Sequence, residues 1–440
     1  MKAPVAVTIR EAAYRKIFRR VVWYLFVLYI CAYLDRINIG FAALAMNRDL
    51  GLTPVTFGIA NTIFYLGYLV FEVPSNMMLA RFGARTWLAR IMITWGLAST
   101  ATALAAGENS LYLLRLMVGI AEAGFVPGVV LYLTYWFPQA YRGRANAFFM
   151  VAQPVSIAFG SILSGNLLKM DGVLGLAGWR WLFIIEGVPS IVLGVVTFFY
   201  LRDGPRDAAW LSAAEKAVVE EQLAAESTVT PQHGSVWMEL RSRQVLLLCL
   251  AYFGLVSTLN TNATWVPQIV REILGGQADF VTVGMWAAVP ALLTVVAMPL
   301  WSYRSDRRHE RLWHVVIPMT IAALGWLLVT LSAVPLVRFG GLALVSIGGF
   351  CGMSIFWTLP ASVLSQAARP AGIALISMAG IFGSAVSPSI IGFLRDQTGT
   401  FTSGLFYLVA LLAVSIVCVR ASARDVPMQP LGLHRNPSSS

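Results

Sequence analysis

Long apolar segments follow one another along almost the whole chain and are separated by short polar stretches. Most of them reach about 20 residues, the length at which an α-helix crosses the hydrocarbon core of a bilayer. We therefore predict an all-α membrane protein with twelve transmembrane helices. The predicted helices span residues 21–46, 57–79, 87–106, 112–137, 145–168, 179–200, 245–266, 281–301, 314–333, 339–363, 371–393 and 403–419.

The composition supports a bilayer environment. Only 12% of the 440 residues are charged and 58% are hydrophobic, whereas a soluble domain carries about 25% charged residues. The first apolar segment is too long for the core of a cleavable signal peptide, so we interpret it as a retained first helix. The four cysteines of the chain lie inside apolar segments without a CxxC pair, a pattern of small core residues rather than of a disulfide or metal framework.

The distribution of basic residues predicts the orientation in the membrane. An even number of helices places both termini on one side. Most of the 32 lysine and arginine residues lie in the loops and termini of that side. Because loops rich in lysine and arginine stay in the cytoplasm, we expect both termini to be cytoplasmic. The net charge of +11 then faces anionic lipid from dispersed loops, and no nucleic-acid partner is needed to explain it.

One long hydrophilic segment, residues 201–243, divides the chain. Within it Ser212 and Glu215 have the spacing of a capping box, which predicts the start of an amphipathic helix. We interpret this segment as a cytoplasmic linker between two helical bundles. The predicted domains are an N-terminal six-helix bundle at 1–200, the linker at 201–243, a C-terminal six-helix bundle at 244–424 and a cytoplasmic tail at 425–440.

The two predicted bundles share sequence features at a constant spacing. The segment 139–142 (QAYR) matches 366–369 (QAAR), and Gly165 matches Gly392 at the same offset along the chain. A third match, between the basic loops after the second and the eighth helix, has nearly the same offset. Such a duplication predicts two parallel repeats that rock around a central site.

Charged residues inside the predicted helices are the first candidates for function. An ionisable side chain at the centre of a bilayer costs at least ~2.5–3.5 kcal/mol, and the first helix places Asp35 and Arg36 near its midpoint. Arg36 shares a helical stripe with Tyr29 and Tyr33. A guanidinium group binds the two oxygens of a carboxylate in pairs, so we predict that Arg36 anchors an organic anion. The alternative is a structural clamp formed by Asp35 and Arg36.

The fourth predicted helix carries Arg115 and Glu122 on one face. Glu122 lies near the middle of the helix, where burial favours an acid that binds and releases protons. We predict that Glu122 and Asp35 couple transport to protons and that Arg115 contributes to anion binding. Two alternatives stay open: Arg115 as a side chain that snorkels to the outer interface, and Glu122 as a structural partner of an arginine.

Further polar and aromatic residues in the predicted helices are candidates for the wall of a central site. Each of them could instead be an ordinary packing or hydrogen-bonding residue between helices. The candidates are Tyr68, Gln153, Asn260, Asn262 and Trp357.

Four strings give the chain a resemblance to a known family. They are YLDRINIG at 33–40, EVPSN at 72–76, RLMVGIAEAG at 115–124 and WRWLFIIEG at 179–187. Together with the basic loop after the second helix they resemble the major facilitator superfamily, and within it the anion:cation symporter family. The most similar branch serves tartrate, phthalate and 4-hydroxyphenylacetate. This resemblance implies transport by alternating access across a bacterial inner membrane.

The resemblance also implies a cytoplasmic gate, and one residue departs from the pattern. The loop after the second helix usually carries an acid before its arginine, and here that position is Ala80. Its counterpart in the second half keeps the acid. We therefore expect the second-half loop and an acid of the second helix to contribute to the gate. The predicted gate and structural residues are Glu72, Arg81, Arg85, Asp306 and Arg307.

These observations predict a secondary transporter that imports a small hydroxylated or aromatic carboxylate together with protons. An anion exchanger on the same fold is the alternative, since it needs the arginines but no proton carrier. A membrane enzyme or sensor is a remote alternative, because no nucleophile triad, phosphate-binding loop or metal-ligand set is present in the sequence. We expect no cofactor, no metal and no enzymatic activity, and a protein that works as a monomer.

Overall fold

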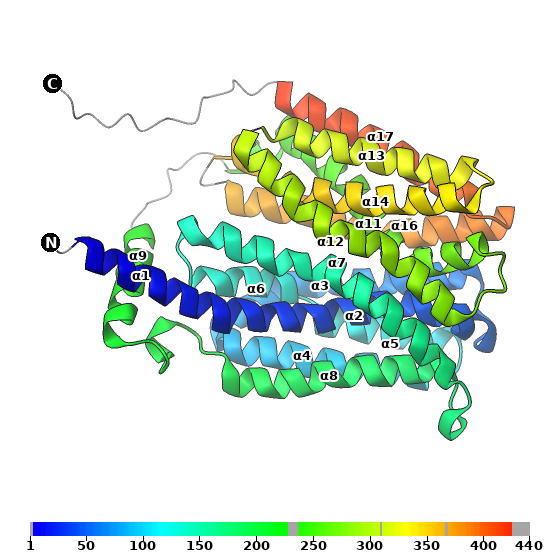
Figure 1. Cartoon of the computed structure of the whole chain (residues 1–440), viewed down its shortest axis with the longest axis horizontal. Coiled ribbons are helices and arrows are strands. Elements are labelled where there is room, and N and C mark those ends of the chain that lie inside the picture. Colours follow the sequence, from blue (N-terminus) through cyan, green and yellow to red (C-terminus); the bar gives the residue numbers. More distant parts are fainter. Residues whose placement is uncertain (1–2, 228–235, 309, 366–367, 425–440) are drawn as a thin grey trace.

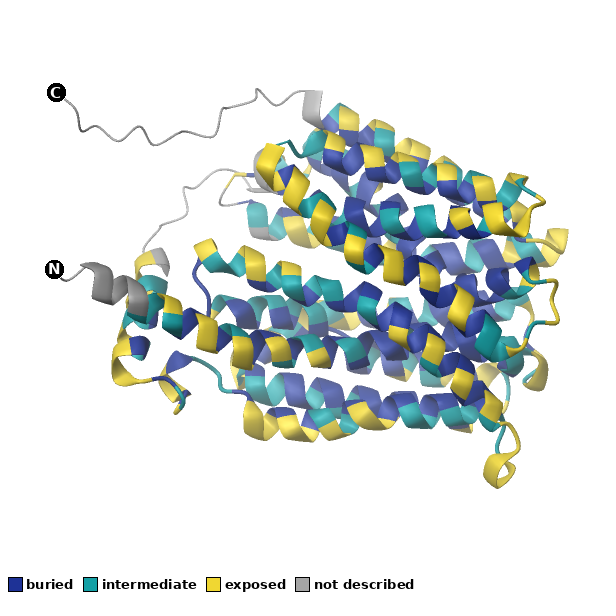
Figure 2. Cartoon of the chain, in the orientation of Figure 1, coloured by how far each residue is buried: buried dark blue, intermediate teal, exposed yellow. Residues whose placement is uncertain are grey.

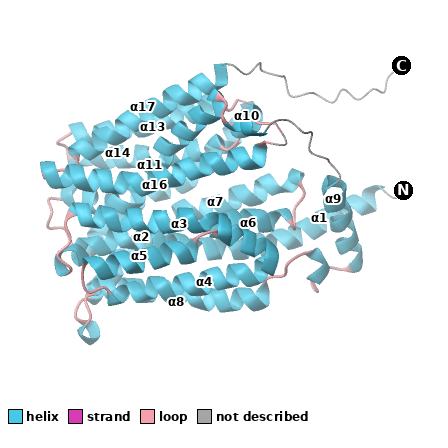
Figure 3. Ribbon diagram, turned by 180° about the vertical axis from the view of Figure 1, so that it is seen from behind, coloured by secondary structure: helices cyan, strands magenta, loops and turns pink. Residues whose placement is uncertain are grey.

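The computed structural model describes residues 3–227, 236–308, 310–365 and 368–424. These residues form helices joined by loops, with no strand among them (Figure 3). The linker residues 228–235 and the predicted tail, 425–440, lie outside this description.

The first half of the chain begins with helix α1 (Ala3–Ile17), which continues through a π-helical turn (Phe18–Val22) into the first long helix. The helices that follow in this half are α2 (Trp23–Asp49), α3 (Pro54–Phe82), α4 (Ala84–Ala101), α5 (Glu108–Glu122), α6 (Phe125–Thr134), α7 (Gln139–Leu167) and α8 (Gly178–Tyr200). The linker contributes α9 (Ala213–Ser227) and α10 (Val236–Leu240). The second half contains α11 (Arg243–Ile273), α12 (Phe280–Arg308), α13 (Leu312–Leu331), α14 (Pro335–Phe356), α15 (Pro360–Val363), α16 (Arg369–Thr398) and α17 (Thr402–Arg424).

Eleven helical segments of the described chain are long and apolar enough to cross a membrane. Helix α4, at the predicted third span, is not among them. It has only 18 residues, and Arg85 and Arg90 lower its mean hydropathy, although it packs along α8 inside the bundle (Figure 1). Twelve spans therefore stay a prediction. Large apolar side chains such as Val70, Phe199 and Leu336 are exposed, and exposed positions follow the outward faces of the helices (Figure 2), as expected of a surface that faces lipid.

Two predicted spans are among the eleven candidates but are not single helices over their predicted lengths. The span predicted at 112–137 is broken between α5 and α6, because Gly124 adopts a left-handed conformation with φ +87°. A Cβ atom at this position would lie 2.5 Å from the hydroxyl oxygen of Ser75, so the glycine also permits close packing on α3. The span predicted at 339–363 ends as a long helix at Phe356 and is followed by the short helix α15.

The linker packs against the first half of the molecule. Ser212 and Glu215 form the expected capping box, with hydrogen bonds of 2.8 and 3.3 Å between side chains and backbone amides. Glu215 also pairs with Lys16 of α1 at 2.7 Å, and Tyr14 donates to Gln222 at 2.8 Å. Helices α1 and α9 are therefore held together at this end of the first half. We call the end of the molecule where they lie the linker end, and the opposite end the far end (Figure 1).

The two halves meet by direct backbone contact at the far end. Helix α3 crosses α16 where a Cβ atom on Gly58 would lie 2.6 Å from the carbonyl oxygen of Pro388. A Cβ atom on Gly392 would lie 2.2 Å from the carbonyl oxygen of Pro54. Neither distance leaves room for a side chain, so these glycines set how closely the two halves approach.

A second crossing, between α7 and α12, repeats the first. Cβ atoms on Gly165 and Gly284 would lie 2.5 and 2.4 Å from carbonyl oxygens of the opposite helix. The step along the chain from Gly58 to Gly284 is nearly the same as the step from Gly165 to Gly392. The two crossings thus match the spacing of the predicted duplication, and both bring the two halves into contact at the far end.

Candidate functional site

A buried ion pair joins α2 to α5 inside the first half. Arg36 donates from Nε to Oε1 of Glu122 at 2.5 Å, and its Nη2 contacts the same oxygen. The guanidinium carbon lies 5.3 Å from the centre of the Tyr68 ring, within the range of a cation–π interaction. The Arg36 side chain keeps 18% of its surface exposed, whereas Glu122 keeps 2%. Solvent therefore reaches the arginine of this pair rather than the glutamate.

The broken span places Glu122 in an unusual electrostatic setting. It is the last residue of α5, where the helix dipole disfavours a negative charge. Its second oxygen, Oε2, is buried and has no hydrogen-bond partner among the described residues. Arg36 is the only ion-pair partner that the described chain gives this carboxylate, so the charge of Glu122 depends on that contact.

Arg115 lies two turns before Glu122 on α5 and is also buried, with 3% exposure. Its guanidinium carbon sits 4.5 Å from the centre of the Phe64 ring. No ion pair involves Arg115 within the described part of the chain, and its Nε has no hydrogen-bond partner there. The possibility that Arg115 snorkels to an outer interface is wrong for this structure, because the side chain is enclosed between helices. A buried cation without a fixed counter-ion favours the binding of an anion beside it.

Asp35 faces away from this pair. Its carboxylate accepts hydrogen bonds from Ser99 at 2.6 Å, from Ser190 at 3.1 Å and from Asn38 at 3.3 Å. These donors belong to α4, α8 and α2, so Asp35 lies within the bundle rather than at the interface between the halves. Asp35 and Arg36 therefore do not pair with each other, and each contacts other helices instead.

The tyrosines of the α2 stripe face α7. The hydroxyl of Tyr29 accepts a hydrogen bond from Gln153 at 2.5 Å, and its ring stacks on Phe149 with centroids 4.3 Å apart. Tyr33 meets Tyr29 edge to face at 6.0 Å. Both tyrosines are almost fully buried. The structure thus brings Tyr29 and Gln153 together, within the same half as the Arg36–Glu122 pair.

The candidates from the second half do not form one group. Asn260 accepts from the Tyr65 hydroxyl of α3 at 2.7 Å and donates to the Ser384 carbonyl at 2.9 Å, and so links the two halves. Trp357 packs edge to face on Tyr252 at 4.8 Å within an aromatic cluster of the second half.

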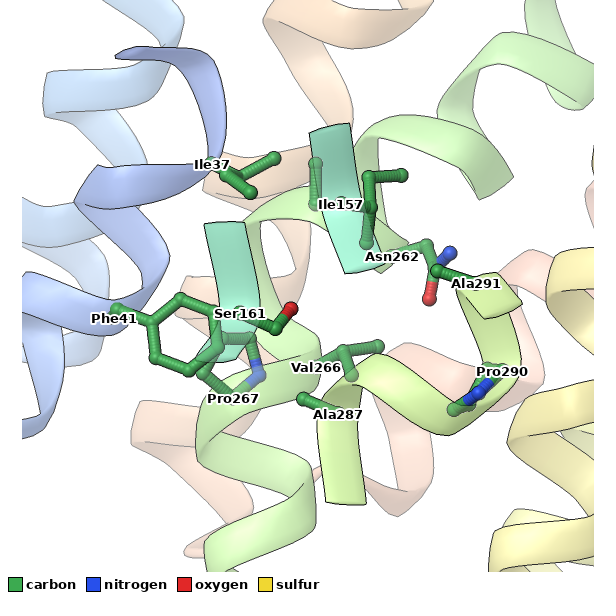
Figure 4. Close-up of a pocket in the computed structure, with 11 residues that line it drawn as sticks. Ile37, Phe41, Ile157, Ser161, Asn262, Val266, Pro267, Ala287, Pro290 and Ala291 are labelled. Atoms are coloured by element: carbon green, nitrogen blue, oxygen red, sulfur yellow. The ribbon is translucent and has the colours of Figure 1, made fainter. Parts of the chain in front are cut away.

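Asn262 lines a narrow cleft between α2, α7, α11 and α12 (Figure 4). Ser161 is the other polar side chain there, and the remaining lining is apolar. Of the predicted binding residues, only Asn262 contributes to this cleft.

The predicted gate residues are dispersed in this conformation. Asp306 pairs with Arg311 at 2.7 Å. No ion pair involves Glu72, Arg81 or Arg307 in the described part of the chain, so a gate built from Asp306, Arg307 and Glu72 is not formed.

An acid that was not predicted, Asp203 in the segment after α8, contacts the junction between α3 and α4 instead. Asp203 accepts from the backbone amide of Arg85 at 2.9 Å, and a Cβ atom on Gly83 would lie 3.0 Å from its side chain. The sequence signal that could have identified Asp203 is its position directly after the sixth predicted span.

A further polar residue escaped prediction at the centre. Tyr65 differs from the predicted Tyr68 by one helical turn, and only the fold shows that it reaches Asn260 across the interface. Among the described residues no cluster of three or more histidine, cysteine, aspartate or glutamate side chains could hold a metal ion.

Apolar helices in two related halves, with arginines and acids buried in one of them, are the features of a membrane transporter. The chain belongs to the Major Facilitator Superfamily, whose family model matches residues 25–388. This confirms the predicted superfamily.

The relatives are transporters rather than enzymes. A protein of Agrobacterium vitis named "Putative tartrate transporter" is 44% identical over 414 residues, which cover 94% of this chain and 95% of the relative. A "Quinolone resistance transporter" of Acinetobacter baumannii is 35% identical over 395 residues, covering 89% and 91%. The crystal structure of a D-xylose–proton symporter has a TM-score of 0.74 at 14% identity, with 93% of this chain and 98% of that chain covered, and shows the same fold.

Proposed function

We propose that this protein imports a small organic anion together with protons, and that a hydroxylated dicarboxylate such as tartrate is its first candidate substrate. The observation that carries the proposal is the buried pair of Arg36 and Glu122, in which the arginine is partly exposed and the glutamate is not. The 44% identity to a protein named as a tartrate transporter supports the substrate class.

In the proposed mechanism, substrate and Glu122 compete for Arg36. A guanidinium group already held by a carboxylate binds a second one weakly, because its donors are occupied. When Glu122 takes up a proton, its negative charge disappears and Arg36 becomes free for a substrate carboxylate. Loss of the proton on the other side of the membrane restores the Arg36–Glu122 pair and expels the substrate. The helix dipole at Glu122 favours the neutral form and so assists the first step.

Arg115 provides a second positive charge two turns away from Glu122 on the same helix. A dicarboxylate has a second negative charge to match it, whereas a neutral sugar has none. The hydroxyls of Tyr65 and Tyr68 and the amide of Asn260 offer hydrogen bonds to the hydroxyl groups of a substrate. We therefore expect hydroxylated or aromatic carboxylates to be transported and neutral sugars to be rejected.

The membrane potential sets the number of protons. A cytoplasm that is negative by 100 mV opposes each entering negative charge by about 2.3 kcal/mol. One proton compensates a monocarboxylate, and a dicarboxylate needs two to reach electrical balance. Glu122 is the proton carrier that communicates with the substrate, and a group that includes Asp35 is the candidate for the second proton.

The orientation follows from the basic loops. We place both termini and the linker end on the cytoplasmic side of a bacterial inner membrane. When α4 is counted as a span, the chain crosses the membrane twelve times and the far end faces outward. The closed glycine crossings then correspond to an inward-facing state of an alternating-access cycle. Rocking of the two halves would open these crossings and expose Arg36 to the outside. A single chain contains both halves, so a monomer suffices.

The test is uptake of radiolabelled L-tartrate into proteoliposomes with an alkaline interior. We expect the wild type to accumulate tartrate above its external concentration and to stop when a protonophore is added. Glu122→Gln mimics the protonated acid and should exchange tartrate across the membrane without concentrating it. Glu108→Gln, at the exposed start of the same helix α5, is the matched control and should behave like the wild type. Full gradient-driven accumulation by Glu122→Gln would refute the mechanism.

Two other outcomes would replace the proposal. Uptake that depends on internal tartrate and ignores both the pH gradient and the protonophore would indicate an anion exchanger. The similarity to a quinolone resistance transporter makes drug export the second candidate. In that case, inside-out vesicles would take up a fluoroquinolone and tartrate would not compete.

A further inference from the structure

A second pair of acids lies inside the first half, apart from the pair formed by Arg36 and Glu122. Asp35 of α2 and Glu186 of α8 have 3% and 2% exposure. Within the described residues neither takes part in an ion pair, and their hydrogen-bond partners are hydroxyl and amide groups. Ser164 of α7 donates to Oε1 of Glu186 at 2.8 Å. Glu186 lies two turns inside α8 rather than at its end.

Two oxygen atoms between these acids lack a partner. Oε2 of Glu186 and Oδ1 of Asn38 are both buried, and neither has a hydrogen-bond partner among the described residues. Asn38 is fully buried, donates to Asp35 at 3.3 Å and also lies against Glu186. If Glu186 is ionised, both of these oxygen atoms can only accept hydrogen bonds. A buried acceptor without a donor is costly, so the arrangement lacks one donor or one cation.

The surrounding charges do not supply that cation. Over longer range Asp35 interacts with Glu122 and Arg115 on α5, and Arg115 is shared with Glu122. Asp35 is the charged neighbour that acts on Glu186. The groups facing the two acids from α4, α7 and α8 are the hydroxyls of serine residues. Two negative charges held this way would each lose their hydration without a compensating cation.

The two acids differ in how well their charged forms are stabilised. Asp35 accepts hydrogen bonds from Ser99, Ser190 and Asn38, whereas Glu186 accepts one from Ser164 and has Asn38 as its other polar neighbour. Hydrogen bonds to a carboxylate favour its charged form, so the proton belongs on Glu186. A proton on Oε2 turns that atom from an acceptor without a donor into a donor, and the Oδ1 atom of Asn38 is an unpartnered acceptor on a neighbouring side chain.

We propose that Asp35, Asn38 and Glu186 form a proton-binding site in which Glu186 holds the proton and Asn38 connects it to Asp35. The site lies on a different face of α2 from Arg36, so it binds a proton without competing with the substrate for the arginine. Its use as the second coupling proton rests on the proposed function, but its existence does not. The pair is suited to the extra proton that a dicarboxylate requires.

Infrared spectroscopy of the purified protein in lipid tests the site directly, because a protonated carboxyl group has a carbonyl stretch that a carboxylate lacks. We expect a protonated-carboxyl band at pH 7 in sodium-free buffer that Glu186→Gln removes. Glu108→Gln should keep this band. Asn38→Ala should shift it, since the acid loses its acceptor. This shift identifies the hydrogen-bonded acid even if Glu186→Gln folds poorly.

Two results would overturn the proposal. A band that is unchanged in Glu186→Gln would show that Glu186 is ionised. A band that disappears when sodium is added to the wild type, with formation of carboxylate, would make the site a metal-cation site instead.

Transport measures the role of the site independently. If the pair carries one of two protons, Glu186→Gln should lower the tartrate accumulation ratio about tenfold for each unit of imposed pH gradient. Equal accumulation by Glu186→Gln and Glu108→Gln would exclude this role. Failure of the wild type to couple tartrate to protons would refute the proposed function, while the infrared result would still decide whether the acid pair binds a proton.

Discussion

The glycine crossings at the far end offer the sharpest test of how the molecule closes. In Gly392→Ala the new methyl group would lie 2.2 Å from the carbonyl oxygen of Pro54. The two backbones must therefore separate by about 1 Å to reach an ordinary contact of 3.4 Å. Overpacking of this kind costs ~1–3 kcal/mol. Because the contact exists only while the far end is closed, the cost falls on that state, and each ~1.4 kcal/mol changes the ratio of closed to open molecules about tenfold.

Accessibility of a cysteine in the narrow cleft measures this ratio. Ser161 lines the cleft and is 1% exposed, so a Ser161→Cys thiol is protected while the far end is closed. We expect Gly392→Ala to accelerate its labelling by a membrane-impermeant maleimide about tenfold or more. Gly340→Ala is the matched control, because a Cβ atom there would meet nothing within 4 Å. The four native cysteines, measured without the added thiol, give the background.

The glycine at the equivalent position of the other crossing gives a second test. Gly165 is the counterpart of Gly392 and has a similar contact, with a Cβ distance of 2.5 Å. Gly165→Ala should therefore accelerate labelling as well. If both variants fold, yet label no faster than Gly340→Ala, close glycine packing does not hold the far end shut and the argument fails.

Two further predictions concern the site and the linker. Arg36→Lys keeps the positive charge but loses the paired donors of the guanidinium group, so tartrate should no longer raise the melting temperature of this variant. Stabilisation by tartrate equal to that of the wild type would contradict the role of Arg36. Burial acts to raise the pKa of Glu215, but hydrogen bonds with Lys16 and Ser212 outweigh it and hold that pKa below its usual range. The stability that Glu215 contributes is therefore present above its unfolded pKa of about 4.3 and is lost as the pH falls through the lower folded value. Hydrogen exchange of α9 should rise below about pH 4 in the wild type. In Glu215→Gln, which lacks this carboxyl, exchange of α9 should already be faster at neutral pH and should show no such rise.

The sequence predicted most of the long helices because hydrophobic length is a local property. It overestimated the regularity of the fourth span, since mean hydropathy does not register the left-handed conformation of Gly124. Helix α4 shows the opposite effect. The apolar pattern predicted a span at 87–106, but the arginines of α4 lower its mean hydropathy so far that it is not among the eleven candidate spans, although it packs along α8.

The sequence predicted the types of residue in the candidate site but not which of them contact each other. Helical geometry indicated that Asp35 and Arg36 point in different directions, and the structure shows where each goes. Which arginine meets Glu122 depends on how α2 and α5 are placed, and no short-range pattern contains that information. The same holds for Tyr65, whose partner, Asn260, belongs to the other half of the chain.

The duplication copied the helices without copying their charges, and this asymmetry bears on the transport cycle. At the offset that relates Gly165 to Gly392, the counterparts of Arg115 and Glu122 are Leu342 and Gly349. In the described second half no acidic residue or arginine is fully buried, and its central polar groups are amides and hydroxyls such as those of Asn260. A charged substrate thus interacts far more strongly with the first half than with the second. We therefore expect the substrate to stay on the arginines of the first half while the second half, hydrogen-bonded through Asn260, rocks over it and away from it.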